Sequence, residues 1–358
     1  MDEVRPGSAS QPGSALKPGS ASQQFENLMS PTTESGPVYL VTGCAGFIAS
    51  RVAAQLLESG HRVVGVDNVN DYYDTSLKQH RLDQLQDDRF EFHRLDIEDA
   101  DALGELFAKH RFACVFNLAA RAGVRYSMEN PHVYLTTNSL GSLNLLHHMQ
   151  QTGVEKYVLA STSSLYAGQP MPFQESLPVN TPISPYAASK KGAEVMAYSH
   201  HHLYDIDVSI CRYFTVYGPA GRPDMSIFRF IRWIDEGQPI QRLGEGEQSR
   251  DFTFVDDIAR GTILAAKPVG YEIINLGGGG TPVSLNRLIQ MLEERLKKKA
   301  IVERLPFHKA DMQSTSADIG KAQSLLGWKP QVSLADGLDE CVRWYQNNAP
   351  WSHEIVLP

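Results

Sequence analysis

The segment ISPYAASKK places a tyrosine and a lysine four residues apart, at Tyr186 and Lys190. Ser184 suits the N-cap of a helix and Pro185 its first position, so both side chains are expected on one helical face. The pKa of a free tyrosine, near ~10, is too high for a base at neutral pH, but a neighbouring ammonium favours the phenolate. The pair can therefore take a proton from a hydroxyl group, although a surface pair on an amphipathic helix has the same spacing.

Hydroxyl side chains follow one another where the apolar segment KYVLA ends, at Ser161, Thr162, Ser163 and Ser164. Hydroxyl groups at the end of a strand often cap the next turn, which is the simplest interpretation of this run. The same groups can also hold polar atoms of a ligand. The run contains no carboxylate, and this absence is informative once the chemistry of the site is considered.

A glycine-containing turn, VTGCAGFIAS, links the first apolar segment to a helical pattern. Gly43 permits a tight turn, and Gly46 lets the backbone approach a pyrophosphate at the helix N-terminus. Ala49 stands at the third glycine position, where a methyl group is tolerable. An ordinary tight turn is the alternative, but the context of strand, turn and helix favours dinucleotide binding.

Two acidic residues at strand ends support this interpretation. Asp67 closes the segment RVVGVD, where a carboxylate accepts hydrogen bonds from an adenosine ribose and repels a 2′-phosphate, so NAD is favoured over NADP. Asp96, in RLDI, stands where it can meet the adenine, or it simply caps the following helix.

Short apolar segments alternate with helical patterns from residue 38 onward. The expected strands are VYLVT, RVVGVD, FEFHRLD, ACVFNLA, KYVLAS and VSICRYF, and the expected helices cover residues 47–58, 75–86, 100–109, 136–152 and 185–204. Strands that are apolar throughout and alternate with helices form a parallel sheet covered on both faces. We therefore expect an α/β fold with a Rossmann-type doubly wound parallel sheet, which binds ligands beyond the carboxyl ends of its strands.

The alternation loosens after Tyr217, and two amphipathic helices follow at 284–299 and 335–346. We expect residues 37–217 to form the NAD-binding Rossmann domain. Residues 218–358 should form mainly a smaller mixed α/β substrate-binding lobe, from which some elements return to the first domain. Residues 1–36 contain a six-residue Pro/Gly/Ser unit repeated three times, and this composition predicts a disordered tail.

The bulk composition excludes several classes of protein. The chain has 358 residues with 42% hydrophobic and 21% charged residues, and its net charge of −8 argues against a nucleic-acid surface. No stretch approaches the ~18 apolar residues of a membrane span. Four scattered cysteines without CxxC or Cys/His spacing predict free thiols, no metal and a reducing, cytoplasmic compartment.

Several longer motifs carry a resemblance to a known family. The segments TGCAGFI, DN at Asp67–Asn68, NLAA, STSSLY, YAASK and RYFTVYGP resemble an extended short-chain dehydrogenase/reductase. More narrowly, DNVNDYYDTSLKQHRL, AGVRYSMENPHVY, RYFTVYGPAGRPDMSIFRF and RDFTFVDDI resemble UDP-glucuronate 4-epimerases. The chain departs from the family pattern at Ala49, Ala167 and Ala220, none of which touches a reacting group.

The resemblance implies roles for individual residues. Thr162 becomes the third catalytic residue beside Tyr186 and Lys190, because it hydrogen-bonds the hydroxyl that is oxidised. The further cofactor-binding positions that it implies are Phe47, Ile48, Asn68, Ile97, Leu118, Ala119, Ala120 and Asn138, in addition to Gly43, Gly46, Asp67 and Asp96. Asn138 is expected to hold the active-site backbone through water.

A second set of residues is expected around a UDP-sugar substrate. Arg222 and Arg250 are candidates for the diphosphate, since a guanidinium binds phosphate with two parallel hydrogen bonds. Arg125 and Ser127 are expected to line the sugar site, and Asp311 to accept from the uridine ribose. A solvated surface position remains the alternative for each of them.

The hydroxyl run separates this chain from related enzymes. Dehydratases of the family have TDEVYG here and UDP-glucuronate decarboxylases resemble TSEVYG, whereas this chain has TSSLYA. A 4-ketone of glucuronate is a β-keto acid that loses carbon dioxide readily, so an epimerase must hold the carboxylate still. Ser163 and Ser164, with Thr162 and Thr215, are expected to do this by hydrogen bonding, whereas a glutamate would repel the carboxylate.

The expected function is therefore NAD-dependent epimerisation at carbon 4 of UDP-glucuronate, giving UDP-galacturonate for polysaccharide biosynthesis. Alternatives are a 4-epimerase of UDP-glucose or UDP-N-acetylhexosamine, a UDP-glucuronate decarboxylase, and a sensor or scaffold that binds NAD without catalysis. The resemblance also implies a homodimer, in which the Tyr186 helix and the helix before it form the interface.

Overall fold

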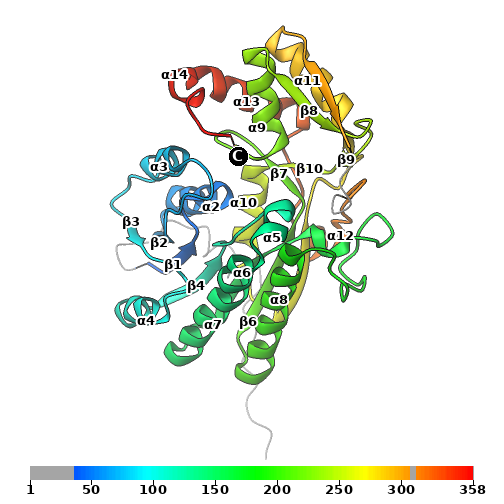
Figure 1. The fold of residues 1–358 in the computed structure, drawn as a ribbon. Helices are drawn as coiled ribbons and strands as arrows, with labels where there is room; N and C mark the ends of the chain where they lie inside the picture. Colours follow the sequence, from blue (N-terminus) through cyan, green and yellow to red (C-terminus); the bar gives the residue numbers. More distant parts are fainter. Residues whose placement is uncertain (1–35, 307–311, 358) are drawn as a thin grey trace, which may run out of the picture.

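The computed structural model describes residues 36–306 and 312–357. The tail expected at residues 1–36 lies outside this part of the chain except for its last residue, and so does Asp311. The described residues form a central sheet with helices on both faces and a second lobe on top of it (Figure 1).

Seven parallel strands form the central sheet in the order β11-β6-β5-β4-β1-β2-β3. The strands are β1 (Val38–Thr42), β2 (Arg62–Asp67), β3 (Phe90–Arg94), β4 (Phe112–Asn117), β5 (Lys156–Thr162), β6 (Asp207–Tyr213) and β11 (Tyr271–Leu276). The strand order reverses between β1 and β4, and ligands of open α/β sheets bind at such a switch point. The expected Rossmann-type fold is confirmed.

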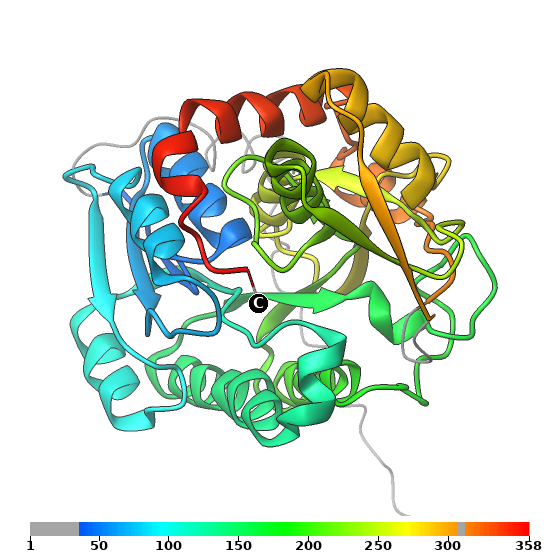
Figure 2. The ribbon, with the colours of Figure 1, turned by 45° about the horizontal axis from the view of Figure 1, so that its top comes forward.

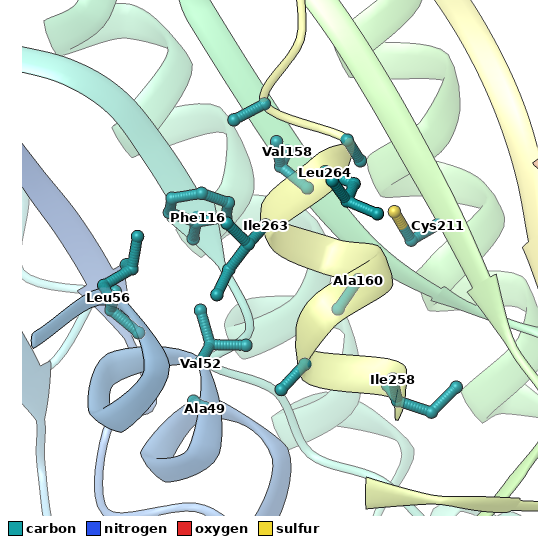
Figure 3. Close-up of a cluster of buried hydrophobic side chains, with 14 of the residues drawn as sticks. Ala49, Val52, Leu56, Phe116, Val158, Ala160, Cys211, Ile258, Ile263 and Leu264 are labelled. Carbon is teal, nitrogen blue, oxygen red and sulfur yellow. The ribbon is translucent and has the colours of Figure 1, made fainter. Parts of the chain in front are cut away.

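Helices cover both faces of this sheet. On one face they are α2 (Phe47–Glu58), α10 (Val255–Leu264) and α12 (Gly320–Leu326), and on the other α4 (Ala100–Lys109), α7 (Gly141–Thr152) and α8 (Pro185–Tyr204). Figure 3 shows the first face, where side chains of α2 and α10 meet those of the strands. Ala49 is buried in this cluster, so a methyl group fits at the third position of the glycine turn.

The second lobe has its own apolar core. Its elements are β7 (Thr215–Tyr217), α9 (Ser226–Glu236), β8 (Pro239–Leu243), β9 (Ser249–Arg250), β10 (Phe252–Phe254), β12 (Val283–Ser284), α11 (Leu285–Leu296), β13 (Ile301–Leu305) and α13 (Leu334–Asn347). Three elements of this half of the sequence return to the first domain, because β11 pairs with β6, α10 packs against α2, and α12 packs against β11.

Helix boundaries differ from the sequence-based expectation at three main places, one of which is α11, which ends at Leu296 and not at residue 299. The helix expected at 75–86 is α3 (Thr75–Asp83), which is shorter. The helix expected at 136–152 is preceded by α5 (Val124–Glu129) and α6 (Pro131–Tyr134), and its first residues form a π-helical segment, η1 (Leu135–Leu140), before α7 begins. Such π-helical turns are rare in proteins, and those that do occur are often found at functional sites.

The C-terminal residues link the second lobe to the first domain. After α14 (Ala349–Ser352) the chain crosses to α3, where the backbone N–H of Val356 donates to Asp74 Oδ2 at 2.9 Å. Figure 2 shows this red segment lying beside the blue helices of the first domain. None of the helices in the described part of the chain combines the length and the apolar character that crossing a bilayer requires.

Candidate active site

The glycine turn between β1 and α2 is closed by its own backbone. Gly43 has a φ of +72°, and its N–H donates to the Val66 carbonyl at 2.6 Å. The N–H of Gly46 donates to the Gly43 carbonyl at 2.7 Å, and no side chain caps the N-terminus of α2 at Gly46. The first turn of α2 therefore keeps its N–H groups for an anionic group such as a pyrophosphate.

The segment after β4 lies directly against this turn. A Cβ atom on Gly43 would stand 2.8 Å from the backbone of Ala119. Thr42 fixes the distance between the two segments, because its Oγ1 accepts from the N–H groups of Leu118 and Ala119 at 3.1 and 3.0 Å. The structure thus brings Leu118 and Ala119, two of the expected cofactor-binding residues, next to the glycine turn.

The acidic residues of the expected adenosine site are engaged with their own loop. Asp67 is buried, and its two oxygens accept from the N–H groups of Ala45 and Val69 at 3.1 and 2.7 Å. Asp96 accepts from Asn68 Nδ2 at 2.6 Å and from the N–H of Glu98 at 3.0 Å. Carboxylate oxygens have further lone pairs, so both can still accept from a nucleoside.

Two basic residues of α3 that were not predicted from the sequence also reach this region. Lys78 is buried with its Nζ 4.0 Å from Asp67 Oδ1, and burial lowers the pKa of Lys78 to about 8 while the Asp67 carboxylate acts in the opposite direction. Arg81 is buried and donates to the carbonyls of Ala45 and Ala220 at 3.1 and 2.7 Å. The spacing of three between them in DTSLKQHRL predicts that the two side chains share one face of the helix, but not that they reach this region.

The tyrosine at the start of α8 meets the threonine at the end of β5. Ser184 caps α8 by accepting from the Ala187 N–H at 3.2 Å, and Tyr186 follows on the first turn. Burial raises the pKa of Tyr186 above its usual value, whereas a hydrogen bond with Thr162 and the charge of Arg222 lower it. Thr162 therefore lies close enough to Tyr186 for its hydroxyl to lower the pKa of the phenol.

Lys190 is buried one turn further along α8. Its Nζ donates to the Ala160 carbonyl at 2.9 Å, near the end of β5. Burial lowers the pKa of Lys190 to about 8, and the Glu194 carboxylate acts in the opposite direction. The groups that favour the Tyr186 phenolate in this structure are Thr162 and Arg222. The Lys190 ammonium, which the sequence predicted for this role, is hydrogen-bonded to the Ala160 carbonyl of β5.

A buried ion pair lies beneath the tyrosine and the lysine. Glu194 and Arg212 are each 1% exposed, and the guanidinium donates to both carboxylate oxygens at 2.9 and 2.8 Å. Ser161 donates to the same carboxylate at 2.7 Å, and Arg212 also donates to Tyr166 at 2.9 Å. Burial alone would raise the pKa of Glu194, but Arg212 holds it below its usual value.

Asn138 joins the segment after β4 to α8 without an intervening water. Its Oδ1 accepts from the Arg121 N–H at 2.9 Å, and its Nδ2 donates to the Arg121 carbonyl and to Ser189 Oγ at 3.0 and 2.9 Å. Ser189 in turn donates to the Tyr186 carbonyl at 2.8 Å. Asn138 lies in the π-helical segment η1, which aims its amide between these two segments.

The hydroxyl groups at the end of β5 differ in their hydrogen bonding. Thr162 caps the short 3₁₀ helix η2 (Ser163–Tyr166) by accepting from the Ser164 N–H at 3.1 Å. Among the described residues, neither the Ser163 nor the Ser164 hydroxyl has a protein hydrogen-bond partner. Turn capping is therefore the task of Thr162, and the two serine hydroxyls remain available for a ligand.

Arg222 is the sequence-predicted cation nearest to these groups. It donates to Asp224 at 2.9 and 2.5 Å and to the Ala122 carbonyl at 3.2 Å, and its guanidinium lies 5.8 Å from the ring centre of Tyr72. Its charge lowers the pKa of Tyr186. The arginine is therefore positioned near the reacting end of the site, with Asp224 fixing its orientation.

The other predicted substrate residues are less closely connected to this centre. Ser127 is completely buried, and its hydroxyl donates to the Val124 carbonyl at 2.6 Å within α5. Arg250, on β9, donates to the Ser249 carbonyl at 2.9 Å. Thr215 begins β7, which pairs with β10, and Arg125 lies on α5.

The residues present fit a dinucleotide. Gly43 and Gly46 form a turn too tight for any side chain, since a Cβ on either would stand 2.8 Å from backbone atoms. The uncapped helix N-terminus, the carboxylates of Asp67 and Asp96, and the Thr162–Tyr186 pair all stand beyond the carboxyl ends of β1, β2, β3 and β5. This is the edge of the sheet where NAD binds in such folds.

Comparison with known proteins agrees with this geometry. A model of the NAD-dependent epimerase/dehydratase family matches residues 39–277. The chain is 58% identical over 311 residues to a UDP-glucuronate 4-epimerase of Thermodesulfobacterium geofontis. The aligned region covers 87% of this chain and 96% of that protein.

Solved structures of two epimerases have a similar fold. A UDP-glucuronic acid 4-epimerase from Bacillus cereus in complex with UDP-glucuronic acid and NAD is 37% identical, with a TM-score of 0.82 over 87% of this chain and 99% of that one. A UDP-glucose 4-epimerase from Thermotoga maritima with UDP-glucose is 32% identical, with a TM-score of 0.79 over 87% and 99% of the two chains.

The substitution Gly43→Ala should abolish NAD binding. The new Cβ would stand 2.8 Å from the Ala119 backbone, so the turn and the segment after β4 must separate. We expect at least a tenfold loss of NAD retained on purification, measured by mass spectrometry of the extracted nucleotide. Gly153→Ala is the matched control, because Gly153 has the same φ of +72° with nothing within 4 Å of the added methyl group. Equal NAD retention in both variants would contradict the geometry.

The substitution Arg212→Met should strongly destabilise the protein. It leaves the Glu194 carboxylate buried without its partner, which costs about 3–5 kcal/mol of unfolding free energy in comparable pairs. The double variant Arg212→Met/Glu194→Leu should recover much of this loss, as urea denaturation would show. Lys321→Met is the control, because Lys321 pairs with Glu272 at a half-exposed position, where such a loss stays under about 1 kcal/mol. A double variant no more stable than Arg212→Met would contradict the prediction.

Proposed function

The chain belongs to the NAD-dependent epimerase/dehydratase family, and from that premise we propose that its reaction is the 4-epimerisation of UDP-glucuronate to UDP-galacturonate. It is an NAD-dependent sugar-nucleotide 4-epimerase. The observation that carries the choice of a glucuronate substrate is the pair of unpartnered hydroxyls at Ser163 and Ser164, beside the contact of Thr162 with Tyr186. The UDP-glucuronate 4-epimerases among its relatives support the same choice.

The chain's own residues handle the proton of the reaction. Bound NAD supplies the acceptor and donor of the hydride at sugar carbon 4. Thr162 holds the 4-hydroxyl by a hydrogen bond, and Tyr186 takes its proton as the ketone forms. Because the free protein has a raised Tyr186 pKa, the positive charges of Arg222 and of the oxidised nicotinamide are what favour the phenolate in the complex. Once the ketone has turned over, the hydride returns to the opposite face of carbon 4 and Tyr186 returns its proton to the 4-oxygen, so no net redox change remains.

The hydroxyl run protects the intermediate. The 4-ketone of glucuronate is a β-keto acid, and it loses carbon dioxide when the carboxylate bond aligns with the carbonyl π system. Ser163, Ser164 and Thr215 hold the carboxylate in another plane through hydrogen bonds. A carboxylate side chain at this place would repel the substrate.

The remaining groups bind the nucleotide. Arg222 and Arg250 contact the diphosphate, Arg125 and Ser127 line the sugar site, and Asp311 accepts from the uridine ribose. Residues 37–217 bind NAD, and residues 218–358 mainly bind the UDP-sugar. This division is supported by the separate apolar core of the second lobe.

Other reactions of the family make different products from the same first step. A UDP-glucose 4-epimerase needs no group for a carboxylate, and a decarboxylase releases carbon dioxide. A product screen over UDP-glucuronate, UDP-glucose and UDP-N-acetylhexosamine separates these possibilities. A sensor or scaffold that only binds NAD would convert none of them.

Incubation with UDP-glucuronate should yield UDP-galacturonate without carbon dioxide, measured by chromatography and isotope release. The variant Tyr186→Phe removes the proton acceptor and should lower kcat by about 10²–10⁴-fold with NAD content unchanged. Tyr204→Phe, at the exposed far end of the same helix, is the matched control and should keep full activity. UDP-pentose as the main product, or near-native turnover by Tyr186→Phe, would refute the assignment.

We also propose that the protein is a homodimer built on α8 and the η1–α7 helix. Large apolar side chains lie exposed on this face: Leu135, Leu140, Val195, Met196 and Leu203. Monomeric proteins rarely expose a contiguous apolar patch of this kind. A second copy of the same face, related by a twofold axis, would bury these side chains.

The substitution Val195→Glu should therefore produce a monomer. It places a charge in the centre of the proposed interface, where burial of an unpaired carboxylate is costly. Light scattering coupled to size-exclusion chromatography measures the mass of both proteins. Ile301→Glu, on the exposed strand β13, is the control and should leave the dimer intact. A monomeric wild-type protein would refute the proposal.

The free thiols and the expected product indicate the compartment and the class of pathway in which the enzyme acts. All four cysteines are free and buried, which suits a reducing, cytoplasmic compartment. UDP-galacturonate is an activated sugar, so the class of reaction that consumes it is glycosyl transfer during polysaccharide biosynthesis.

A further inference from the structure

We propose that Glu91, His93 and His110 form a binding site for a divalent transition-metal ion of the zinc class, separate from the active site. Glu91 and His93 lie two residues apart on the edge strand β3, so their side chains point to the same face of the sheet. That face is covered by α4, and His110 is the residue at which α4 ends. Figure 1 shows β3 and α4 at the same side of the molecule.

The three ligand atoms are already close together. His93 Nε2 lies 2.7 Å and His110 Nε2 lies 3.6 Å from the same oxygen, Glu91 Oε1, and all three atoms lie within 4.8 Å of one another. Ligand bonds of ~2.0–2.1 Å in a tetrahedral zinc site place neighbouring ligand atoms about 3.3–3.4 Å apart. The His93–Glu91 distance has to widen by less than an ångström, and the other two distances, both within 4.8 Å, have to adjust to the same value.

The imidazoles are held in place before any ion binds. The His110 ring stacks on Phe112, with ring centres 5.6 Å apart and an angle of 25° between the planes, and its side chain is 16% exposed. His93 meets His110 edge to face at 6.2 Å, and its side chain is 29% exposed. Glu91 is half exposed and can turn its carboxylate toward an ion at little cost.

The chemistry of the three ligands selects the ion. Two imidazoles and one carboxylate suit zinc and its neighbours cobalt, nickel and copper, whereas magnesium and calcium prefer oxygen alone. Three protein ligands leave one position for water. The ion replaces a single surface hydrogen bond between His93 and Glu91 with three bonds, so binding is not opposed by loss of a buried interaction.

Such an ion would tie the edge of the sheet to its interior. β2 and β1 separate β3 from β4 in the sheet, and the ion would connect β3 to the junction of α4 and β4. Beyond β3 the chain passes Leu95, whose N–H donates to the Asp67 carbonyl at 3.1 Å, and reaches Asp96. The ion therefore stabilises the folded state at the adenosine side of the domain, and the stabilisation grows with its concentration.

Calorimetric titration of the chelator-treated, NAD-containing full chain with ZnCl₂ tests the site. We expect the double variant His93→Ala/His110→Ala to bind one equivalent fewer than the wild type and to lose the zinc-dependent rise of the unfolding temperature. The double variant His132→Ala/His147→Ala, which removes two exposed imidazoles elsewhere, is the matched control and should bind as the wild type does.

The isosteric substitution Glu91→Gln tests the third ligand without a change of shape. It replaces the charged ligand by a neutral amide and should weaken zinc binding about tenfold or more, comparable to the loss of a supporting group in known sites. Epimerase turnover of the two double variants and of Glu91→Gln should equal that of the wild type, because none of the substituted residues contacts the active site. Equal zinc binding by the wild type and the His93→Ala/His110→Ala variant would overturn the proposal, whatever the epimerase activity.

Discussion

The buried pair of Glu194 and Arg212 is the interaction on which the active site depends. Glu194 stands on α8 one turn beyond Lys190 and two turns beyond Tyr186, so the position of this carboxylate sets the rotation of the whole helix. Arg212 on β6 and Ser161 on β5 both donate to it. The helix that carries the proton acceptor is thereby fixed to β6 and to β5, the strand at whose end Thr162 and the serines lie.

This arrangement explains why the lysine keeps a charge in a buried place. Burial lowers the pKa of Lys190 to about 8, and the carboxylate one turn away limits that fall. Above pH 8 the ammonium form becomes the minority, so the charge is present under neutral conditions and is lost as the pH rises. Tyr186 faces the opposite tendency, because burial disfavours its charged form. Without the cofactor, the site therefore contains a neutral Tyr186 phenol and a charged Lys190 amine. Binding of the positively charged cofactor favours ionisation of the phenol.

Local signals predicted much of this from the sequence, and tertiary contacts account for the rest. The limits of α8 followed from a serine cap and a proline at the first position, and β1 and β2 followed from uninterrupted apolar runs. The start of the helix at residue 136 was misplaced, because α6 begins at Pro131 and continues into a π-helical segment that aims Asn138 at α8. The hydrogen bond of Lys190 to Ala160 could not be foreseen, since helical spacing shows which side chains share a face but not which strand carbonyl competes for them.

Arg81 shows why some functional residues have no local signal. It lies on α3 inside the NAD-binding domain, and its guanidinium donates both to Ala45 in the glycine turn and to Ala220 in the loop that carries Arg222. An epimerase with no net redox change must keep its cofactor while the sugar rotates, so the cofactor turn and the substrate loop have to move as one body. A buried guanidinium carries its donors on three nitrogens in a rigid plane, so it can connect carbonyls of distant segments in this way. The requirement arises only when both segments are folded, and for this reason the sequence around Arg81 resembles an ordinary amphipathic helix.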